Sequence, residues 1–357
     1  MSRFFSDKYS ALTPYTPGEQ PRDRQFVKLN TNENPYPTSV SARKFAAQAA
    51  ERLHLYSDIG CTALTAKLSQ MYDIPKDCIL FTNGSDEALN FAFMALCDVD
   101  HPAVFPDITY GFYPVFAALN GVPYEEIPLA DDFTVRVEDY CGVNKTIFLA
   151  NPNAPTGIAL PLSDIERIVS SNPDNIVVID EAYVDFGAVS AVSLIGKYDN
   201  LIVTQTFSKS RSLAGGRLGM ALACPSLIRD LNTVKFSTNP YNVNTLTQAA
   251  GLGALEDEIY FCDTCSWIIN DRVYLTGELE KLGFTVLPSM ANFVFAKHPA
   301  IDGGELYRQL KERGVLIRHF TIERIRDYNR ITVGTRAQIA VLLDNIKDIL
   351  GGCYENR

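Results

Sequence analysis

Short runs of consecutive apolar residues alternate with stretches of helical spacing through the middle of the chain. The strand-like runs, rich in Val, Ile, Leu and Phe, are 78–84, 102–106, 146–152, 175–182 and 201–208. Continuous apolar strands of this kind are typical of a sheet that is buried on both faces. The stretches with apolar residues every three or four positions include 85–97, 110–121 and 162–172. The alternation predicts an α/β fold with a mostly parallel sheet covered by helices.

The two ends of the chain follow other patterns. Residues 1–40 hold many Pro, Asn and Thr residues, which predicts an irregular N-terminal arm. Near the other end, strand-like stretches at 283–297, 314–320 and 329–334 are separated by helical ones, which predicts a smaller α+β domain. We therefore expect three parts, with the arm grouped with the small domain: the arm at 1–40, a large domain at 41–270 and the small C-terminal domain at 271–357.

Composition limits the classes of partner. The 357 residues carry a formal net charge of −10, which argues against a general nucleic-acid or acidic-membrane surface, because phosphate binding needs a basic field. No apolar run approaches the roughly 18 residues that a membrane-spanning helix needs, and the polar start predicts no secretory leader. The scattered cysteines favour the cytoplasm.

One C-x-x-C motif, Cys262 and Cys265, raises the question of a redox or metal site. A zinc site needs four ligands, and no second C-x-x-C or nearby histidine completes the set. We interpret the two cysteines as helix positions one turn apart, and we expect no metal site in this protein.

Polar residues follow several of the predicted strands. Ligands bind at the carboxyl ends of parallel strands, so these residues are candidates for chemistry. Gly84, Ser85 and Asp86 begin a helix, where free backbone N–H groups bind phosphate, although Ser85 also suits plain capping. Asp180 ends a buried strand, where a carboxylate holds a protonated ring nitrogen, pairs with a lysine or caps a turn. Asn153, between two prolines, offers an amide to a ligand or serves only the turn.

The stretch "SKSRSLAGGRLG" at 208–219 places Lys209 after a β-branched strand and before a loop of small residues. A lysine that attacks a carbonyl must be neutral for part of the time, and an electropositive or desolvated setting lowers a lysine pKa. Arg211 and Arg217 are candidates both for that positive charge and for binding a phosphate. A solvated surface lysine is the alternative interpretation.

Taken together and in this order, the motifs resemble the fold-type-I pyridoxal 5′-phosphate (PLP) aminotransferases, and most nearly the histidinol-phosphate aminotransferases. The resemblance covers almost the whole chain. It rests on "LTPYTPG", "KLNTNENPYP", "TNGSDEAL", "PDITYGFYP", "NPNAPTG", "VIDEAYVDF", "FSKSRSLAGGRLG" and "NRITVGTRAQ". It implies a large domain with a seven-stranded, mostly parallel sheet and an enzyme that moves an amino group.

The resemblance also implies roles for individual residues. Lys209 forms the internal aldimine with PLP and shuttles the proton, Asp180 keeps the ring nitrogen protonated, and Tyr183 hydrogen-bonds the ring oxygen. The other implied cofactor contacts are Gly84, Ser85, Asp86, Tyr110, Asn153, Thr206, Ser208, Arg217 and, from the neighbouring subunit of a homodimer, Tyr56. Asn153 is included because Ala154 stands where the family often has the asparagine that contacts the ring.

The substrates implied by the resemblance are an amino donor, most nearly histidinol phosphate of histidine biosynthesis, and a 2-oxo acid acceptor, usually 2-oxoglutarate. The implied substrate contacts are Tyr15, Asn32, Glu33, Arg318 and Arg330. Two alternatives keep the same cofactor site: an aromatic or broad-range aminotransferase, and a threonine-phosphate decarboxylase. A regulator with an aminotransferase-like sensor domain would carry a basic DNA-binding region, which the sequence lacks.

Overall fold

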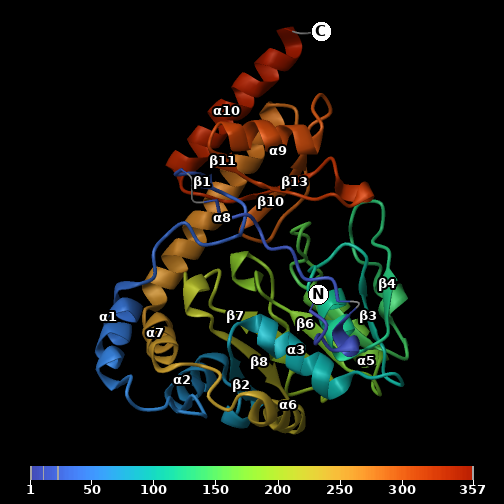
Figure 1. Ribbon diagram of the computed structural model, residues 1–357, viewed down its shortest axis with the longest axis vertical. Helices are drawn as coiled ribbons and strands as arrows, with labels where there is room; N and C mark the ends of the chain where they lie inside the picture. The colour runs from blue at the N-terminus through green and yellow to red at the C-terminus, as the bar shows by residue number, and fades with distance from the viewer. Residues whose placement is uncertain (1, 11, 22–23, 356–357) are drawn as a thin grey trace.

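A seven-stranded sheet in the order β2-β8-β7-β6-β5-β3-β4 forms the centre of the computed structural model, which describes residues 2–10, 12–21 and 24–355 (Figure 1). The strands β3 to β7 run parallel to one another, whereas β8 runs antiparallel to its neighbours β2 and β7. The strands are β2 Ile79–Thr82, β3 Ala103–Pro106, β4 Tyr124–Ile127, β5 Thr146–Ala150, β6 Val177–Asp180, β7 Leu201–Thr206 and β8 Gly219–Ala223. The prediction of an α/β fold with a mostly parallel seven-stranded sheet is confirmed.

Alternate residues of the central strands enter two separate apolar clusters, one on each face of the sheet. Ile147 and Leu149 of β5 pack with α2, α5 and α7, whereas Phe148 packs with α3, α4 and α6. Each such side chain contributes about 1.5–3 kcal/mol when it is buried. The helices are α1 Val40–Ala49, α2 Thr62–Tyr72, α3 Ser85–Leu96, α4 Tyr113–Asn120, α5 Leu162–Ser171, α6 Pro225–Thr238 and α7 Thr245–Glu256.

The C-terminal part is built on a four-stranded antiparallel sheet in the order β12-β13-β10-β9. The N-terminal arm joins this part, because β1 Val27–Lys28 pairs in parallel with β11 Val315–Leu316. The long helix α8 rises from α7 to this sheet (Figure 1), and the domain boundary expected at residue 270 falls inside it. The other elements are α8 Glu258–Lys281, β9 Thr285–Val286, β10 Phe293–Lys297, α9 Gly303–Glu312, β12 Arg318–His319, β13 Asn329–Thr332 and α10 Arg336–Glu355.

Several predicted elements differ in extent. The helix expected at 110–121 begins at Tyr113, and the strand-like stretch 283–297 is interrupted between β9 and β10. The short 3-10 helices are η1 Asp7–Tyr9, η2 Ala50–Arg52, η3 Lys76–Cys78, η4 Val137–Tyr140, η5 Val184–Phe186, η6 Ala191–Leu194, η7 Ala214–Gly216 and η8 Glu323–Ile325.

Cys262 and Cys265 both lie in α8, as the interpretation of the C-x-x-C motif predicts. Cys262 is exposed and Cys265 is buried, and both are free thiols. Within the described ranges, none of the helices has the length and apolar content needed to cross a membrane.

Candidate functional site

Two adjacent cavities open where the parallel strands β5, β6 and β7 end. The inner cavity, of about 120 Å³, is lined by Ser85, Asp86, Tyr110, Ala150, Ala154, Asp180, Ala182, Tyr183, Thr206, Ser208, Lys209 and Arg217. The outer cavity, of about 270 Å³, shares Tyr110, Ala154, Tyr183 and Lys209 with it. The outer cavity also receives Tyr15, Asn32, Arg318 and Arg330. Most of the residues expected from sequence therefore meet in one place.

Asp180 is the buried carboxylate of the inner cavity. It is the last residue of β6 and is only 4% exposed. Its oxygens accept hydrogen bonds from Thr204 Oγ1 at 3.1 Å and from Tyr113 Oη at 3.4 Å. Burial raises the pKa of Asp180 to about 7, and the bond from Thr204 only partly opposes this effect. A cation that entered the cavity beside Asp180 would stabilise its charged form.

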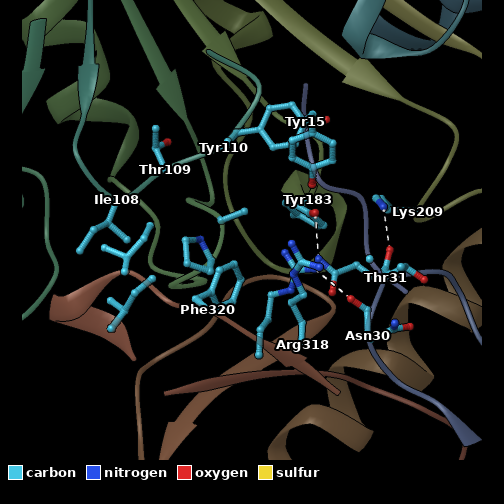
Figure 2. A pocket seen from close by; sticks show the side chains of 18 residues that line it. Tyr15, Asn30, Thr31, Ile108, Thr109, Tyr110, Tyr183, Lys209, Arg318 and Phe320 are labelled. Atoms are coloured by element: carbon cyan, nitrogen blue, oxygen red, sulfur yellow. Dashed lines mark hydrogen bonds between the residues drawn. The ribbon is translucent and has the colours of Figure 1, made fainter. Parts of the chain in front are cut away.

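Lys209 follows β7 and points toward the N-terminal arm (Figure 2). Its Nζ donates a hydrogen bond to the Thr31 carbonyl oxygen at 3.3 Å and lies 5.8 Å from the centre of the Tyr183 ring. The Tyr183 hydroxyl in turn accepts a bond from Asn32 Nδ2 at 2.9 Å. Asn32 is buried and has a φ of 57°, an uncommon backbone conformation for a residue other than glycine. The arm thus reaches two of the four residues that the inner and outer cavities share, Lys209 and Tyr183.

The start of α3 forms one wall of the inner cavity. Gly84, with a φ of 79°, is the N-cap, and within the described residues no side chain caps this helix. The first backbone N–H groups of the helix are therefore available to an anion, and the helix dipole favours negative charge there. The capping role that Ser85 had as an alternative is absent, because Ser85 is the first helical residue.

Hydroxyl groups and one arginine complete that wall. Thr206 Oγ1 and Ser208 Oγ lie 3.0 Å apart in the β7 loop, and both residues line the cavity. Arg217 donates to Asp86 Oδ2 at 2.8 Å, and Asp86 Oδ1 accepts from the Tyr110 hydroxyl at 2.6 Å. Two hydroxyls, free helix N–H groups and a guanidinium around one small cavity suit a phosphate.

The outer cavity contains two arginines on strands of the C-terminal sheet (Figure 2 labels Arg318). Arg330 donates to the Asn30 carbonyl oxygen at 3.1 Å, while its buried Nε has no partner among the described residues. Burial lowers the pKa of Arg330. Arg318 donates to the arm carbonyl oxygens of Thr16 and Pro17 at 3.1 and 3.3 Å. The pair makes this cavity positive and suited to an anionic substrate group.

Two of the expected residues, Asn153 and Glu33, point elsewhere. Asn153 donates to the Ile108 carbonyl oxygen at 3.0 Å and to Thr156 Oγ1 at 3.1 Å, and it lines neither cavity. Its expected cofactor contact stays a prediction that would require these bonds to break. Glu33 pairs with Lys28 at 2.7 Å and also lines neither cavity.

Arg211 and Tyr56 also face away from the two cavities. The Arg211 guanidinium donates to the Ala254 carbonyl oxygen at 2.9 Å and stacks over Phe261, so it binds no ligand of the inner cavity. Tyr56 is 83% exposed and stacks on Tyr241 with 4.4 Å between the ring centres. Tyr56 lines neither cavity, and its expected contact with the cofactor of a neighbouring subunit stays a prediction.

Several residues of the site were missed by the sequence analysis. Thr204 and Tyr113 hold Asp180, and Thr31 accepts the bond from Lys209. Thr204 shows a weak signal, because it lies two residues before Thr206 and therefore on the same face of the strand. The wall of the outer cavity from the C-terminal part, with Phe320, Ile322 and Ile325, has no recognisable motif.

Comparison with known proteins identifies relatives of the whole chain. The family model "Aminotransferase class I and II" matches residues 24–346. The chain is 49% identical over 358 aligned residues to "Histidinol-phosphate aminotransferase 2" of Dechloromonas aromatica, covering 98% of this chain and 100% of that protein.

Solved structures share the fold at lower identity. Histidinol-phosphate aminotransferase of Sinorhizobium meliloti, in complex with pyridoxal-5′-phosphate, superposes with a TM-score of 0.86 at 21% identity, covering 98% of this chain and 99% of that one. The L-threonine-O-3-phosphate decarboxylase of Porphyromonas gingivalis superposes with a TM-score of 0.79 at 23% identity, covering 91% and 99%. The fold alone therefore does not separate amino transfer from decarboxylation.

Proposed function

The chain belongs to the class I and II aminotransferases, in the group of the histidinol-phosphate aminotransferases, and we propose that it moves the amino group of histidinol phosphate to 2-oxoglutarate with PLP as cofactor. The observation that carries the proposal is the meeting of Lys209, Asp180, Tyr183 and Arg217 in one cavity, in a chain related over its whole length to a named histidinol-phosphate aminotransferase. The place in histidine biosynthesis belongs to the same proposal.

The residues of the inner cavity fit PLP. The phosphate would bind the uncapped start of α3 together with Thr206, Ser208 and Arg217. Only glycine fits at position 84, because the backbone there lies close to the Arg217 side chain: a Cβ on Gly84 would lie 2.4 Å from Arg217 Nη2. At the other end, the buried Asp180 has no cationic partner among the described residues, and a protonated ring nitrogen would supply one.

When bound, PLP supplies an aldehyde that bonds to amines and a ring that takes up electrons. Lys209 would hold the aldehyde and move a proton at the substrate carbon that bears the amino group. Asp180 would orient the ring through its nitrogen, Tyr183 would donate a hydrogen bond to the ring oxygen, and Tyr110 would cover one face of the ring. Asn32 fixes the position of the Tyr183 hydroxyl.

The outer cavity would bind the anionic groups of both substrates. Arg330 has a buried Nε without a partner among the described residues, and Arg318 lies beside it. A guanidinium binds carboxylate or phosphate through two parallel bonds, which a lysine does not reproduce. Tyr15, stacked on Phe112 with 4.2 Å between the ring centres, would close over the substrate from the arm.

The test of the proposal is a half-reaction with the purified, PLP-loaded protein. Histidinol phosphate, L-phenylalanine and threonine phosphate are added in parallel, and the change in the cofactor absorbance is followed. We expect kcat/KM to be at least about tenfold higher for histidinol phosphate, because it alone of the three combines a phosphate for the two arginines with a ring for the apolar wall of the outer cavity. A factor of ten requires ~1.4 kcal/mol. A faster reaction of phenylalanine would assign the chain to aromatic amines, and CO₂ release from threonine phosphate would assign it to decarboxylation.

Gly219→Ala is expected to weaken PLP binding by about tenfold or more. A Cβ at this position of β8 would lie 2.3 Å from Gly84 C and Ser85 N, so the start of α3, which would bind the phosphate, would have to shift. The measurement is a titration of the cofactor-free protein with PLP. Gly215→Ala is the matched control, because its Cβ would meet nothing within 4 Å. Equal affinities in the two variants would contradict the assigned phosphate site.

We also propose that two chains form a homodimer in which Tyr56 reaches the PLP phosphate of the neighbouring subunit. Tyr56 is exposed beside Leu53 and Leu55, which are 55% and 54% exposed, and a second chain would bury all three. A cytoplasmic location completes the proposal, because the described cysteines are free thiols.

Mixing two impaired variants tests the contribution of Tyr56. In a hybrid of Lys209→Ala and Tyr56→Ala subunits, one site loses both residues and the other keeps both. We expect the hybrid to recover about half of the wild-type activity, because one of the two sites of a symmetric dimer is intact. The hybrid is purified through two different affinity tags and assayed beside both parents. If Tyr56 acted within its own chain, the hybrid would recover nothing above the Tyr56→Ala parent.

A further inference from the structure

Arg324, on the short helix η8 of the C-terminal part, makes an unusual set of contacts with the large sheet's loops. Its Nη1 lies 3.2 Å from Asp107 Oδ2, and its Nη2 donates to the carbonyl oxygen of Leu129 at 2.8 Å and to that of Ala130. The guanidinium also lies over the Phe133 ring, 5.2 Å from its centre. One side chain therefore bonds to both the end of β3 and the loop after β4.

The segments that Arg324 contacts, Asp107 and the 129–133 loop, are also bonded to each other. Asp107 directly follows β3, and its Oδ1 accepts from the Leu129 N–H at 2.9 Å. Phe133 has a φ of 65°, a strained conformation for an aromatic residue, which turns this loop back on itself. Strain of this kind persists where the surroundings hold it, and Arg324 is one of the groups that does so.

An apolar cluster lies beneath these polar contacts and joins the same two parts of the chain. Ile108, Leu129 and Phe133 from the large-sheet side pack with Phe295, Ile325 and Tyr328 from the C-terminal side. Phe320 packs against the cluster, and Figure 2 shows Phe320 and Ile108 beside the outer cavity. The cluster and the outer cavity share Ile108, Ile325 and Phe320.

We propose that Arg324 is a positioning residue for the amino donor: by fastening η8 to Asp107 and the 129–133 loop, it holds Phe320, Ile322 and Ile325 as the apolar wall of the outer cavity. The inference rests on the proposed function, in which a ring-bearing amine enters this cavity. L-Glutamate, the product of the 2-oxoglutarate half-reaction, has no ring to pack on that wall. The contribution of Arg324 should therefore differ between the two substrates.

The kinetic test uses the PLP-loaded protein. In Arg324→Ala, KM for histidinol phosphate should rise about tenfold, because several bonds of one charged group are lost together. The value of kcat should change less than about threefold, and KM for L-glutamate less than about twofold. Arg324→Lys keeps a positive charge for Asp107, so its KM for histidinol phosphate should lie between the values of the wild type and of Arg324→Ala. Arg326→Ala is the matched control, since Arg326 is exposed and, among the residues that the structure describes, pairs only with Glu323 on its own turn.

A second measurement needs no substrate. Hydrogen exchange of the backbone amides at 318–328 and 129–134 should quicken in Arg324→Ala and in Asp107→Asn, and stay at the wild-type rate in Arg326→Ala. The inference would be overturned if hydrogen exchange in Arg324→Ala stayed at the wild-type rate. It would also be overturned if KM rose by the same factor for histidinol phosphate and for L-glutamate. Arg324→Lys and Asp107→Asn carry the test if Arg324→Ala does not fold. If the wild-type protein did not react with histidinol phosphate, the proposed function would be refuted. The hydrogen-exchange experiment would still decide whether Arg324 holds this wall in place.

Discussion

Lys209→Ala is expected to lower kcat by about 10² to 10⁴-fold or more, the range of one lost acid–base group, with the loss of covalent attachment added to it. Lys209 is the one lysine among the described residues that line the two cavities. No other lysine of the described part of the chain lines either cavity, so none is placed to take over acid–base catalysis or covalent attachment. The measurement is the rate of the half-reaction with histidinol phosphate in the PLP-loaded variant.

Covalent attachment gives an independent readout. After borohydride reduction and proteolysis of the wild-type protein, the cofactor mass should appear on the peptide that contains Lys209, and it should be missing in Lys209→Ala and Lys209→Arg. Lys197→Ala is the control, because Lys197 pairs with Glu166 on the surface, away from both cavities. Cofactor mass on any other lysine, or full activity of Lys209→Ala, would contradict the assignment.

Five of the seven strands of the large sheet, and the residues that follow them, could be predicted from the sequence, because both depend on local pattern and on a general property of parallel sheets; β4 and β8 were not predicted. A continuous apolar run reports a strand buried on both faces, and the ends of parallel strands meet at one edge. Asp180 and Lys209 were expected together for this reason. The strand β4 escaped the same reasoning because it lies at the edge of the sheet and three of its four residues are exposed.

The rest of the site depends on contacts between residues that are far apart in the chain. Thr204 bonds to Asp180 because β6 and β7 pair in that register. Asn32 meets Tyr183 because the arm crosses the molecule, and no local pattern reports such a crossing. The direction of a side chain is equally invisible in sequence: Arg211 and Arg217 both follow Lys209, yet only Arg217 lines the inner cavity.

Asp180→Asn is expected to lower kcat of the PLP-loaded protein by roughly 10² to 10³-fold, the cost of removing one preorganised electrostatic group. The amide keeps the size of the side chain and its bond from Thr204, but it does not hold a protonated ring nitrogen. Glu181→Gln is the matched control. Glu181 is the next residue, is buried as well, and bonds to Ser190 and Gln205 instead of lining the cavity.

The same pair of variants separates catalysis from stability. In the cofactor-free protein, burial raises the pKa of Asp180 from 3.8 to about 7 and that of Glu181 from 4.5 to about 7. Between these limits the folded state binds more protons than the unfolded state, so the free energy of unfolding falls as the pH rises from about 4 to 7. Above that window the loss is complete. Each amide variant should remove the part of this loss that its own carboxyl group causes, which is at most about 4 kcal/mol of unfolding free energy at pH 8.

Thermal unfolding at pH 5 and pH 8 measures this difference. Both amide variants should gain stability over the wild type at pH 8, whereas only Asp180→Asn should lose activity. PLP should change the result for the wild type: a protonated ring nitrogen beside Asp180 favours the carboxylate, so the loaded protein should lose less stability between the two pH values than the cofactor-free protein. A PLP effect of the same size in Asp180→Asn would show that the stabilisation comes from the phosphate end of the cavity alone, and the partnership of Asp180 with the ring would be refuted.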